Sequence, residues 1–171
     1  EVLERKKLSI EKLYLLASQK SVGKELMYNG NKIKVENLED FDFSKSDITF
    51  FSAGKKISEV YAPKAAEFSV VIDNSSFFRM DPDVPLVVPQ VNKEDLSSMK
   101  KNIIANPNCS TAQMVIVLKP LHNLFRIKRV VVSTYQSVSG AGKAPMNELI
   151  DQTKAILEKK DFSIKNFTKQ I

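Results

Sequence analysis

Residues 48–73 have the sequence ITFFSAGKKISEVYAPKAAEFSVVID, and this stretch decides the fold class of the chain. Ile48–Phe51 is a short apolar run that ends in the polar turn Ser52-Ala53-Gly54, as expected for a buried strand. A helix is predicted over Ile57–Phe68, and Ser69–Asp73 is the next apolar run. Strands that alternate with helices in this way indicate an α/β fold with a mostly parallel sheet covered on both faces.

The rest of the chain continues this alternation. Residues 1–9 have the composition of the end of a charged helix. Four further short strands are predicted in the first part of the chain, at Lys12–Ala17, Ile33–Val35 (at a sheet edge), Leu86–Pro89 and Asn102–Ala105. The later elements are a helix that begins near Cys109, a strand over Lys128–Tyr135 and a helix over Pro145–Glu158. We therefore place a domain boundary near Ala105.

Composition limits the class of protein. The chain has 171 residues and 43% hydrophobic content, enough for one packed domain or for one domain and part of another. No apolar run approaches the roughly 20 residues that span a bilayer, and the first residues lack the order of a signal peptide, so we expect a cytoplasmic protein with no membrane partner. The net charge of +6 comes mostly from dispersed lysine, which argues against a nucleic-acid partner and is compatible with small anionic substrates.

The only cysteine of the sequence lies in Asn106-Pro107-Asn108-Cys109-Ser110-Thr111-Ala112-Gln113. Asn-Pro-Asn is poor helix interior but good loop and cap material, so a helix is predicted to begin near Cys109, with Ala112–Leu118 as its apolar body. Backbone N–H groups and the positive end of the helix dipole stabilise a thiolate there, which makes Cys109 a candidate nucleophile. The alternative is that the cysteine serves as a small buried hydrophobe.

Three polar turns follow predicted strands, at Ser18–Gly23, Ser52–Gly54 and Asn74–Arg79. In open α/β sheets, ligands bind beyond the carboxyl ends of the strands. Ordinary loop chemistry explains each turn alone, but we expect the three together to form the rim of a nucleotide site.

Six short motifs, each weak alone, follow one another along nearly the whole chain. They are Ala17-Ser-Gln-Lys-Ser-Val-Gly23, Phe51-Ser-Ala-Gly54, Asp73-Asn-Ser-Ser-Phe-Phe-Arg-Met80, Pro89-Gln-Val-Asn92, Asn106-Pro-Asn-Cys-Ser-Thr111 and Thr134-Tyr-Gln-Ser-Val-Ser-Gly-Ala-Gly142. In this order and spacing the chain resembles the aspartate-semialdehyde dehydrogenase family. The resemblance implies a Rossmann-like NADP-binding domain over residues 1–105 and the start of an α+β catalytic and dimerisation domain over residues 106–171.

The resemblance also implies an activity. It is the reversible, NADPH-dependent reduction of L-aspartyl 4-phosphate to L-aspartate 4-semialdehyde and phosphate by a homodimer, in the biosynthesis of lysine through diaminopimelate, of threonine and of methionine. Cys109 would carry the acyl group as a thioester, and Gln136 would orient the substrate. Arg79 would bind phosphate through its planar donor fork, and Asn108 would be both helix cap and substrate neighbour. From the residues alone, Gln136 and Arg79 are equally well explained as surface residues.

The cofactor implied by the resemblance is NADP. Its 2′-phosphate would meet Lys20 and Ser21, whose charge and hydroxyl favour NADP over NAD. The other implied contacts are Ser52, Ala53 and Gly54 at the adenosine or ribose side and Ser139 and Gly140 at the nicotinamide side, where glycine leaves room for a close approach. No metal site is implied.

The chain departs from the family pattern in two respects. The glycine-rich turn for the pyrophosphate would precede Glu1, and the acid/base histidine and a substrate-carboxylate arginine would follow Ile171. His122 matches no catalytic position of the family and is expected to be a structural or surface residue. We therefore expect these 171 residues to be inactive by themselves. Two alternatives stay open, namely an N-acetyl-glutamyl-phosphate reductase and a catalytically inactive dehydrogenase-like binding module.

Overall fold

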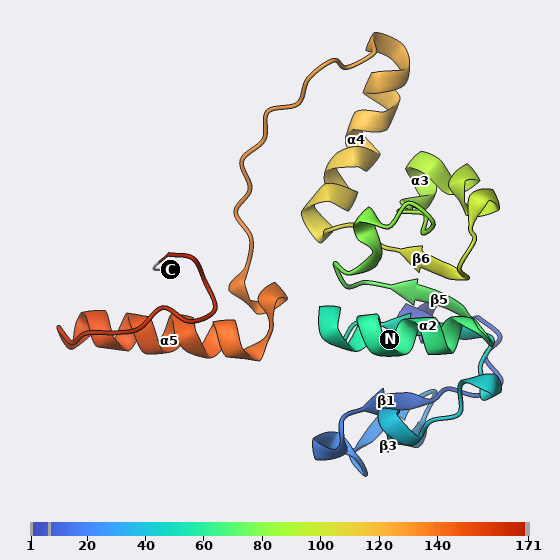
Figure 1. Cartoon of the computed structure of the whole chain (residues 1–171), viewed down its shortest axis with the longest axis horizontal. Coiled ribbons are helices and arrows are strands. Elements are labelled where there is room, and N and C mark those ends of the chain that lie inside the picture. The colour runs from blue at the N-terminus through green and yellow to red at the C-terminus, as the bar shows by residue number, and fades with distance from the viewer. Residues whose placement is uncertain (1, 7, 170–171) are drawn as a thin grey trace. The chain divides into compact units, whose positions relative to one another are not determined.

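A computed structural model describes residues 2–6 and 8–169. The chain divides into two compact units, Glu1–Pro107 (the N-terminal unit) and Asn108–Ile171 (the C-terminal unit). Strands and helices alternate in the N-terminal unit, so the predicted α/β class is confirmed (Figure 1). Among the described residues, no helix is both long enough and apolar enough to cross a membrane.

The strand–helix–strand unit predicted from residues 48–73 is present. β4 (Ile48–Phe51) leads through α2 (Lys55–Ala66) to β5 (Val70–Asp73), and the two strands are parallel. β6 (Ile103–Ala105) pairs in parallel with β5, so the sheet has the order β4-β5-β6. All three strands therefore present their carboxyl ends at one edge.

The core of the N-terminal unit includes one face of α2 and the β4-β5-β6 sheet. Ala62 and Ala65 of α2 are fully buried, as is Val71 of β5. Because alanine has no side chain beyond Cβ, the helix backbone can lie close to the strands. Phe43 and Phe78 belong to the same buried cluster, and burial of each phenylalanine contributes about 1.5–3 kcal/mol.

A second, smaller sheet has the order β1-β3-β2. β1 (Leu15–Ala17) runs parallel to β3 (Asn31–Asn37), whereas β2 (Glu25–Tyr28) is antiparallel to it. β3 is therefore central, and the prediction of an edge strand at Ile33–Val35 is wrong. The hairpin between β2 and β3 turns at Asn29-Gly30 with φ of 47° and 76°, the conformation for which Asn-Gly is the favoured pair. β2 is absent from the predicted strands because its sequence, Glu-Leu-Met-Tyr, shows no alternation of apolar and polar residues, and its side chains are mostly exposed.

Two other predictions for the N-terminal unit need correction. Leu86 makes only a single bridge to Ala105, and α3 (Pro89–Asn92) begins at Pro89, so Leu86–Pro89 is not a strand. Proline lacks the N–H that a ladder needs and suits the first position of a helix. Of the charged helix predicted over residues 1–9, the structure shows α1 (Val2–Arg5), while Glu1 and Lys7 lie outside the described residues. The short 3-10 helices of this unit are η1 (Gln19–Ser21), η2 (Leu38–Asp40), η3 (Phe43–Lys45), η4 (Phe78–Met80) and η5 (Lys93–Ser98).

The C-terminal unit contains α4 (Cys109–Phe125), η6 (Val138–Ala141) and α5 (Lys143–Leu157). Both predicted helices are confirmed, but the strand predicted over Lys128–Tyr135 is wrong, because this segment is extended without pairing (Figure 1). A strand needs a neighbour for its backbone N–H and C=O groups, and the described part of this unit holds no strand to supply one.

Glu148 of α5 ties the following segment back to the helix. Its carboxylate accepts hydrogen bonds from the backbone N–H groups of Lys165 (2.8 Å) and Asn166 (2.7 Å), from Asn166 Nδ2 (2.6 Å) and from Gln152 Nε2 (3.0 Å). Glu148 and Gln152 are both buried. The hydrogen bond from the Lys165 N–H is the largest cause that lowers the pKa of Glu148, because these donors favour its ionised form.

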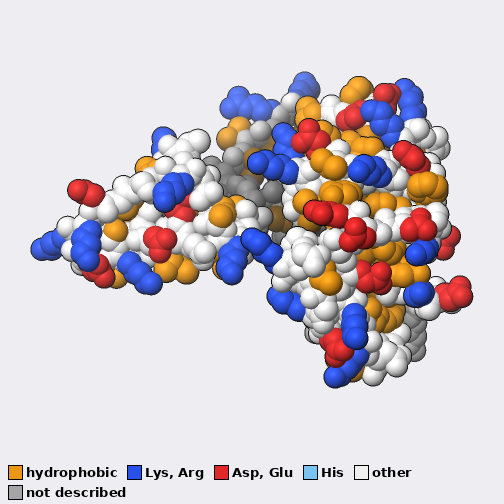
Figure 2. Space-filling model, turned by 60° about the horizontal axis from the view of Figure 1, so that its bottom comes forward, with side chains coloured by type: hydrophobic (Ala, Val, Ile, Leu, Met, Phe, Trp, Pro, Cys, Tyr) orange, Lys and Arg blue, Asp and Glu red, His pale blue; other side chains and the backbone are white. Residues whose placement is uncertain are grey.

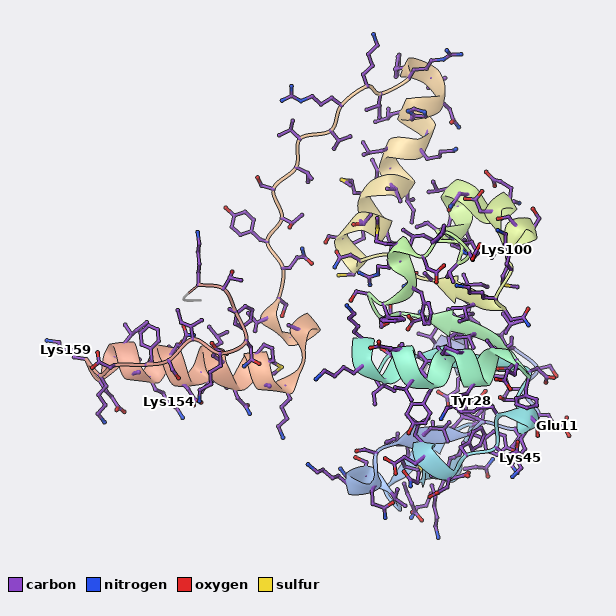
Figure 3. All side chains as sticks on the ribbon, viewed as in Figure 1. Glu11, Tyr28, Lys45, Lys100, Lys154 and Lys159 are labelled. Carbon is purple, nitrogen blue, oxygen red and sulfur yellow. The ribbon has the colours of Figure 1, made fainter. Side chains whose placement is uncertain are left out.

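The charge of the chain is divided unevenly between the units. Residues 1–107 carry 16 Lys and Arg against 16 Asp and Glu, whereas residues 108–171 carry ten against four, so the whole excess of +6 lies in the C-terminal unit. Figure 2 shows basic side chains over the surface of α5, and Figure 3 labels Lys154 on this helix and Lys159 just after its end. Such an excess raises the local concentration of small anions.

Candidate active site

The loops that follow β5 and β6 lie next to each other at the carboxyl edge of the β4-β5-β6 sheet. The backbone hydrogen bonds run one residue past the strands, since the Asn74 N–H donates to the Phe51 carbonyl (2.8 Å) and the Asn106 N–H to the Asp73 carbonyl (2.8 Å). Asp73 pairs in register with Ala105. The chain segments that follow β5 and β6 therefore leave the sheet side by side.

Asp73, the last residue of β5, fixes the turn that follows the strand. Its fully buried carboxylate accepts hydrogen bonds from Ser58 Oγ (2.7 Å), from the Ser75 N–H (2.9 Å) and from Ser75 Oγ (2.7 Å). Ser75 Oγ accepts a hydrogen bond from the Phe77 N–H (3.1 Å). The arrangement is an Asx turn, in which an aspartate side chain binds backbone two residues further on.

Arg79 joins the loops that follow β5 and β6. It lies on η4, half-buried, where its Nε donates to the Asn106 carbonyl (2.9 Å) and its Nη2 to the Asn74 carbonyl (3.3 Å). Asn106 Nδ2 donates to Asn74 Oδ1 (2.7 Å), which links the same two loops. Since a guanidinium has five N–H donors and two serve these carbonyls, three are left for a ligand.

The residues that the resemblance assigns to the cofactor in this unit lie on two loops. Lys20 and Ser21 belong to η1, directly after β1, and Lys20 is exposed. Ser52, Ala53 and Gly54 connect β4 to α2 and are exposed. Gly54 has φ +93°, a conformation that residues with a Cβ rarely adopt, and a Cβ built there meets nothing within 4 Å. Both loops follow the carboxyl end of a strand and offer open surface.

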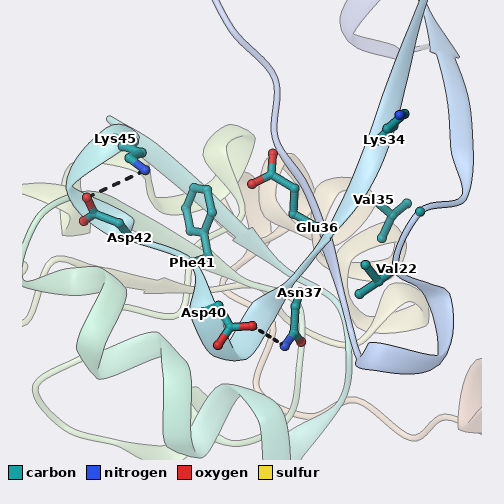
Figure 4. A pocket seen from close by; sticks show the side chains of 10 residues that line it. Val22, Lys34, Val35, Glu36, Asn37, Asp40, Phe41, Asp42 and Lys45 are labelled. Atoms are coloured by element: carbon teal, nitrogen blue, oxygen red, sulfur yellow. Dashed lines mark hydrogen bonds and ion pairs between the residues drawn. The ribbon is translucent and has the colours of Figure 1, made fainter.

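A shallow cavity of about 380 Å³ lies beside β3, bordered by Val22 and Glu36 (Figure 4). Its polar lining residues bind one another, because Asn37 Nδ2 donates to Asp40 Oδ2 (2.7 Å). Neither Lys20 nor Ser21 lines this cavity. The cavity therefore remains separate from the residues assigned to the cofactor.

In the C-terminal unit, Cys109 is the first residue of α4, as predicted from the preceding Asn-Pro-Asn, and it is exposed. Asn108 caps the helix, since its Oδ1 accepts hydrogen bonds from the Ser110 N–H (3.1 Å) and from Ser110 Oγ (2.5 Å). The thiol therefore lies on the first turn of a helix of 17 residues, next to the capping side chain.

Gln136 is held beside the start of this helix. Its Oε1 accepts a hydrogen bond from Asn108 Nδ2 (3.3 Å), and its Nε2 donates to Thr134 Oγ1 (3.0 Å). The segment that carries Gln136 is not the predicted strand, yet the contact brings Gln136 next to the residue that precedes Cys109. Asn108, Cys109 and Gln136 thus form one group within the C-terminal unit.

Ser139 and Gly140 lie on η6, which Ser137 caps. Ser137 Oγ accepts a hydrogen bond from the Ser139 N–H (3.3 Å) and lies 2.7 Å from Ser139 Oγ. A Cβ built on Gly140 meets nothing within 4 Å, so the backbone there is open to a ligand. His122 is exposed on α4, in agreement with a surface role. Within residues 2–6 and 8–169, no group of three or more His, Cys, Asp or Glu side chains is placed to hold a metal ion.

Two residues at the sheet edge are absent from the site predicted from sequence. Asp73 and Asn106 both hold the loop of Arg79, but neither carries a role in the expected chemistry. The Asp-x-Ser spacing of Asp73 and Ser75 is a signal for an Asx turn and could have been used. Nothing local indicates that Asn106 meets Arg79, because 27 positions separate them.

Comparison with known proteins identifies the family. The family model described as "Semialdehyde dehydrogenase, NAD binding domain" matches residues 1–99, and "Semialdehyde dehydrogenase, dimerisation domain" matches residues 118–171. "Aspartate-semialdehyde dehydrogenase 2" of Vibrio cholerae is 49% identical over 173 aligned positions, which cover 100% of this chain and 51% of that protein. The chain thus spans about half the length of the curated relatives that it matches.

Solved structures agree in fold. The crystal structure of aspartate semialdehyde dehydrogenase II complexed with ASA from Vibrio cholerae aligns with a TM-score of 0.87 at 48% identity, over 99% of this chain and 51% of that one. Aspartate semialdehyde dehydrogenase with NADP from Candida albicans aligns with a TM-score of 0.57 at 30% identity, over 72% of this chain and 42% of that one. Together with the six motifs and the arrangement around Cys109, these matches show that the chain belongs to the semialdehyde dehydrogenase family.

Proposed function

We propose that the protein catalyses the reversible, NADPH-dependent reduction of L-aspartyl 4-phosphate to L-aspartate 4-semialdehyde and phosphate, in the biosynthesis of lysine, threonine and methionine. The observation that carries this proposal is the exposed thiol of Cys109 on the first turn of α4, beside the Asn108–Gln136 pair. The names of the relatives support aspartyl phosphate over N-acetyl-glutamyl phosphate as substrate.

In the proposed reaction, Cys109 Sγ attacks the carbonyl carbon of the acyl phosphate. The bond from that carbon to the phosphate oxygen breaks, phosphate leaves, and a thioester remains on Cys109. NADPH supplies, when bound, the hydride that reduces the acyl carbon. The C–S bond then breaks, which returns the thiolate and releases the aldehyde. A thiol suits both ends of the sequence, since it is a strong nucleophile in the first step and a good leaving group in the last.

The other residues of the site position the substrate. Gln136 uses one amide atom toward Asn108 and the other toward Thr134, so its amide plane is held while a second lone pair and a second hydrogen are left for the substrate. Backbone N–H groups at the start of α4 supply donors for the oxyanion of each tetrahedral state. The three N–H groups of Arg79 that do not bind Asn74 or Asn106 match phosphate oxygens.

The cofactor in this proposal is NADP, and the residues proposed to contact it lie on the loops after β1 and β4 and on η6. Lys20 offers a point charge and Ser21 a hydroxyl to the 2′-phosphate. The exposed Ser52-Ala53-Gly54 turn fits the adenosine or ribose side, and Ser139-Gly140 fits the nicotinamide side, because a Cβ at either glycine would point into open space. The Candida albicans structure with NADP supports this choice of cofactor.

A homodimer is part of the same proposal. Residues 118–171 match a dimerisation domain, and Leu124 and Phe125 at the end of α4 are 75% and 76% exposed. Apolar side chains of this size at adjacent positions favour burial against another surface. Light scattering coupled to size-exclusion chromatography of the complete gene product measures the state, and a monomeric mass at micromolar concentration would contradict it.

The activity is tested on the complete gene product in the reverse direction, with aspartate semialdehyde, NADP⁺ and inorganic phosphate. We expect NADPH formation that requires all three, disappears in Cys109→Ser, and falls under iodoacetamide in step with alkylation of Cys109. Thr111→Ala is the matched control, because it removes an exposed hydroxyl two residues away and leaves both the thiol and the Asn108 cap. Full activity in Cys109→Ser would exclude the thioester. Turnover of N-acetyl-glutamate semialdehyde alone would favour the reductase, and an inert thiol with no turnover would favour a binding module.

A further inference from the structure

We propose that Asp73 and Ser75 are positioning residues that hold the guanidinium of Arg79 ready for phosphate. The inference rests on the phosphate role proposed above for Arg79. Asp73 is fully buried and Ser75 is 7% exposed, so neither is placed to touch a substrate. They act on the reaction through the loop that carries Arg79.

The first step is the bond between the two residues. Asp73 uses both carboxylate oxygens, one for the Ser75 N–H and Ser58 Oγ and the other for Ser75 Oγ. A carboxylate that is buried away from water is stable only when such donors replace its hydration. Two of the three donors to Asp73 come from Ser75, so the positions of these two side chains depend on each other.

The second step runs from Ser75 to the helical turn of Arg79. A serine hydroxyl has one hydrogen, and Ser75 Oγ donates it to Asp73 while it accepts the Phe77 N–H (3.1 Å). Phe77 is the cap residue of η4, and Phe78 within η4 is buried in the core. The start of the turn is thus held by Ser75 on one side and by the core on the other.

The third step concerns the acceptors of the guanidinium. Arg79 Nη2 binds the carbonyl of Asn74, the residue between Asp73 and Ser75, so the turn sets the direction of that carbonyl. Arg79 Nε binds the carbonyl of Asn106, whose own N–H donates to the Asp73 carbonyl. Both acceptors of Arg79 therefore depend on the geometry at Asp73.

Ser58 provides a matched control. It donates the third hydrogen bond to Asp73, at the same 2.7 Å as Ser75 Oγ, but it lies on α2 outside the loop. Ser58 is also fully buried. Ser58→Ala and Ser75→Ala therefore remove the same chemical group from the same carboxylate, and only Ser75→Ala also removes the acceptor of the Phe77 N–H.

The experiment compares these variants in the complete gene product. In the reverse reaction we expect Ser75→Ala to raise the KM for inorganic phosphate about tenfold, with the KM for NADP⁺ changed less than about twofold. Ser58→Ala should leave the KM for phosphate within about twofold of the unchanged protein. Inorganic phosphate should raise the melting temperature of Ser58→Ala, and it should raise that of Ser75→Ala much less. This measurement reports phosphate binding without turnover.

A double-mutant cycle tests whether the effect passes through Arg79. If it does, Ser75→Ala adds less than about twofold to the phosphate KM once Arg79→Ala is present. Additive effects, or equal effects of Ser75→Ala and Ser58→Ala, would overturn the inference. An unchanged phosphate KM in Arg79→Ala would instead contradict the phosphate role itself.

Asp73→Asn gives a second route if Ser75→Ala does not fold. In one orientation of the amide, its NH2 group would face the Ser75 N–H, so that two donors meet. In the other, the NH2 group takes the place of the oxygen that accepts from the Ser75 hydroxyl. Either orientation therefore weakens the turn while the volume is kept. We expect the same selective rise in phosphate KM, and a phosphate KM unchanged in Asp73→Asn would count against the inference.

Discussion

Replacement of Asn108 separates two functions that the structure gives to one side chain. Its Oδ1 caps α4 by accepting from the Ser110 N–H (3.1 Å), and its Nδ2 donates to Gln136 Oε1 (3.3 Å). Asn108→Ala removes both interactions. Asn108→Ser keeps a capping oxygen but is too short to reach Gln136. Gln136→Ala leaves the cap and removes only the second contact.

The size of each effect follows from these contacts. Loss of a capping side chain costs about 0.5–2 kcal/mol. The bond to Gln136 is long and joins two largely solvent-accessible groups, so it contributes at the low end of the ~0.5–1.5 kcal/mol typical of hydrogen bonds. We expect Asn108→Ala to lose about 1–2 kcal/mol of unfolding free energy and Asn108→Ser less than about 0.5 kcal/mol.

Far-ultraviolet circular dichroism in a urea titration of the complete gene product is the assay for stability, because it follows the loss of helix as the protein unfolds. The turnover assay of the reverse reaction is run on the same samples. We expect Asn108→Ser to fold as stably as the unchanged protein and yet to turn over as slowly as Gln136→Ala. If Asn108→Ser loses as much stability as Asn108→Ala, the cap does not explain the stability of α4. If it turns over at the normal rate while Gln136→Ala is slow, the contact between Asn108 and Gln136 does not position the amide.

Three further outcomes are expected. Gln136→Ala should lower kcat about tenfold or more and leave the KM for NADP⁺ nearly unchanged, because Gln136 contacts Asn108, the residue that precedes Cys109. Kinetic constants that shift in the opposite pattern would assign Gln136 to the cofactor. Lys20→Ala should weaken the binding of NADP⁺ and leave the binding of NAD⁺ unaffected, as measured by the ratio of the kcat/KM values for the two cofactors. An unchanged ratio would show that Lys20 does not contact the 2′-phosphate. The donors around Glu148, the Lys165 N–H first, hold its pKa below the ordinary 4.5, so its contribution to stability is complete above that pH and is lost as pH falls through the lowered pKa. Hydrogen exchange of the Lys165 and Asn166 amides, corrected for intrinsic rates, should therefore accelerate in acid and, at neutral pH, in Glu148→Gln. The exposed Asp151→Asn is the control and should leave the exchange rates unchanged. Amides that stay protected in Glu148→Gln would contradict the role of the Glu148 carboxylate in holding this segment.

Features of the site that depend on neighbouring residues could be predicted from sequence. The start of α4 at Cys109 follows from the Asn-Pro-Asn that precedes it, since caps and helix starts are set within a few residues. The exposure of Cys109 was left open by the sequence and is decided by the structure. The contacts of Arg79 with Asn106 and of Asn108 with Gln136 could not be predicted, because 27 and 28 positions separate the partners and only the folded chain brings them together.

The amino-acid sequence by itself determined the alternation of β4, α2 and β5, because the period of apolar residues and the turn at Ser52–Gly54 are local properties. Only the tertiary structure decided which strands pair. It placed β3 in the centre of its sheet, whereas Lys128–Tyr135, with its run of valines, pairs with no strand among the described residues. The physical reason is that a strand becomes stable when another chain segment accepts its backbone hydrogen bonds, and the identity of that segment is set by packing across the whole fold.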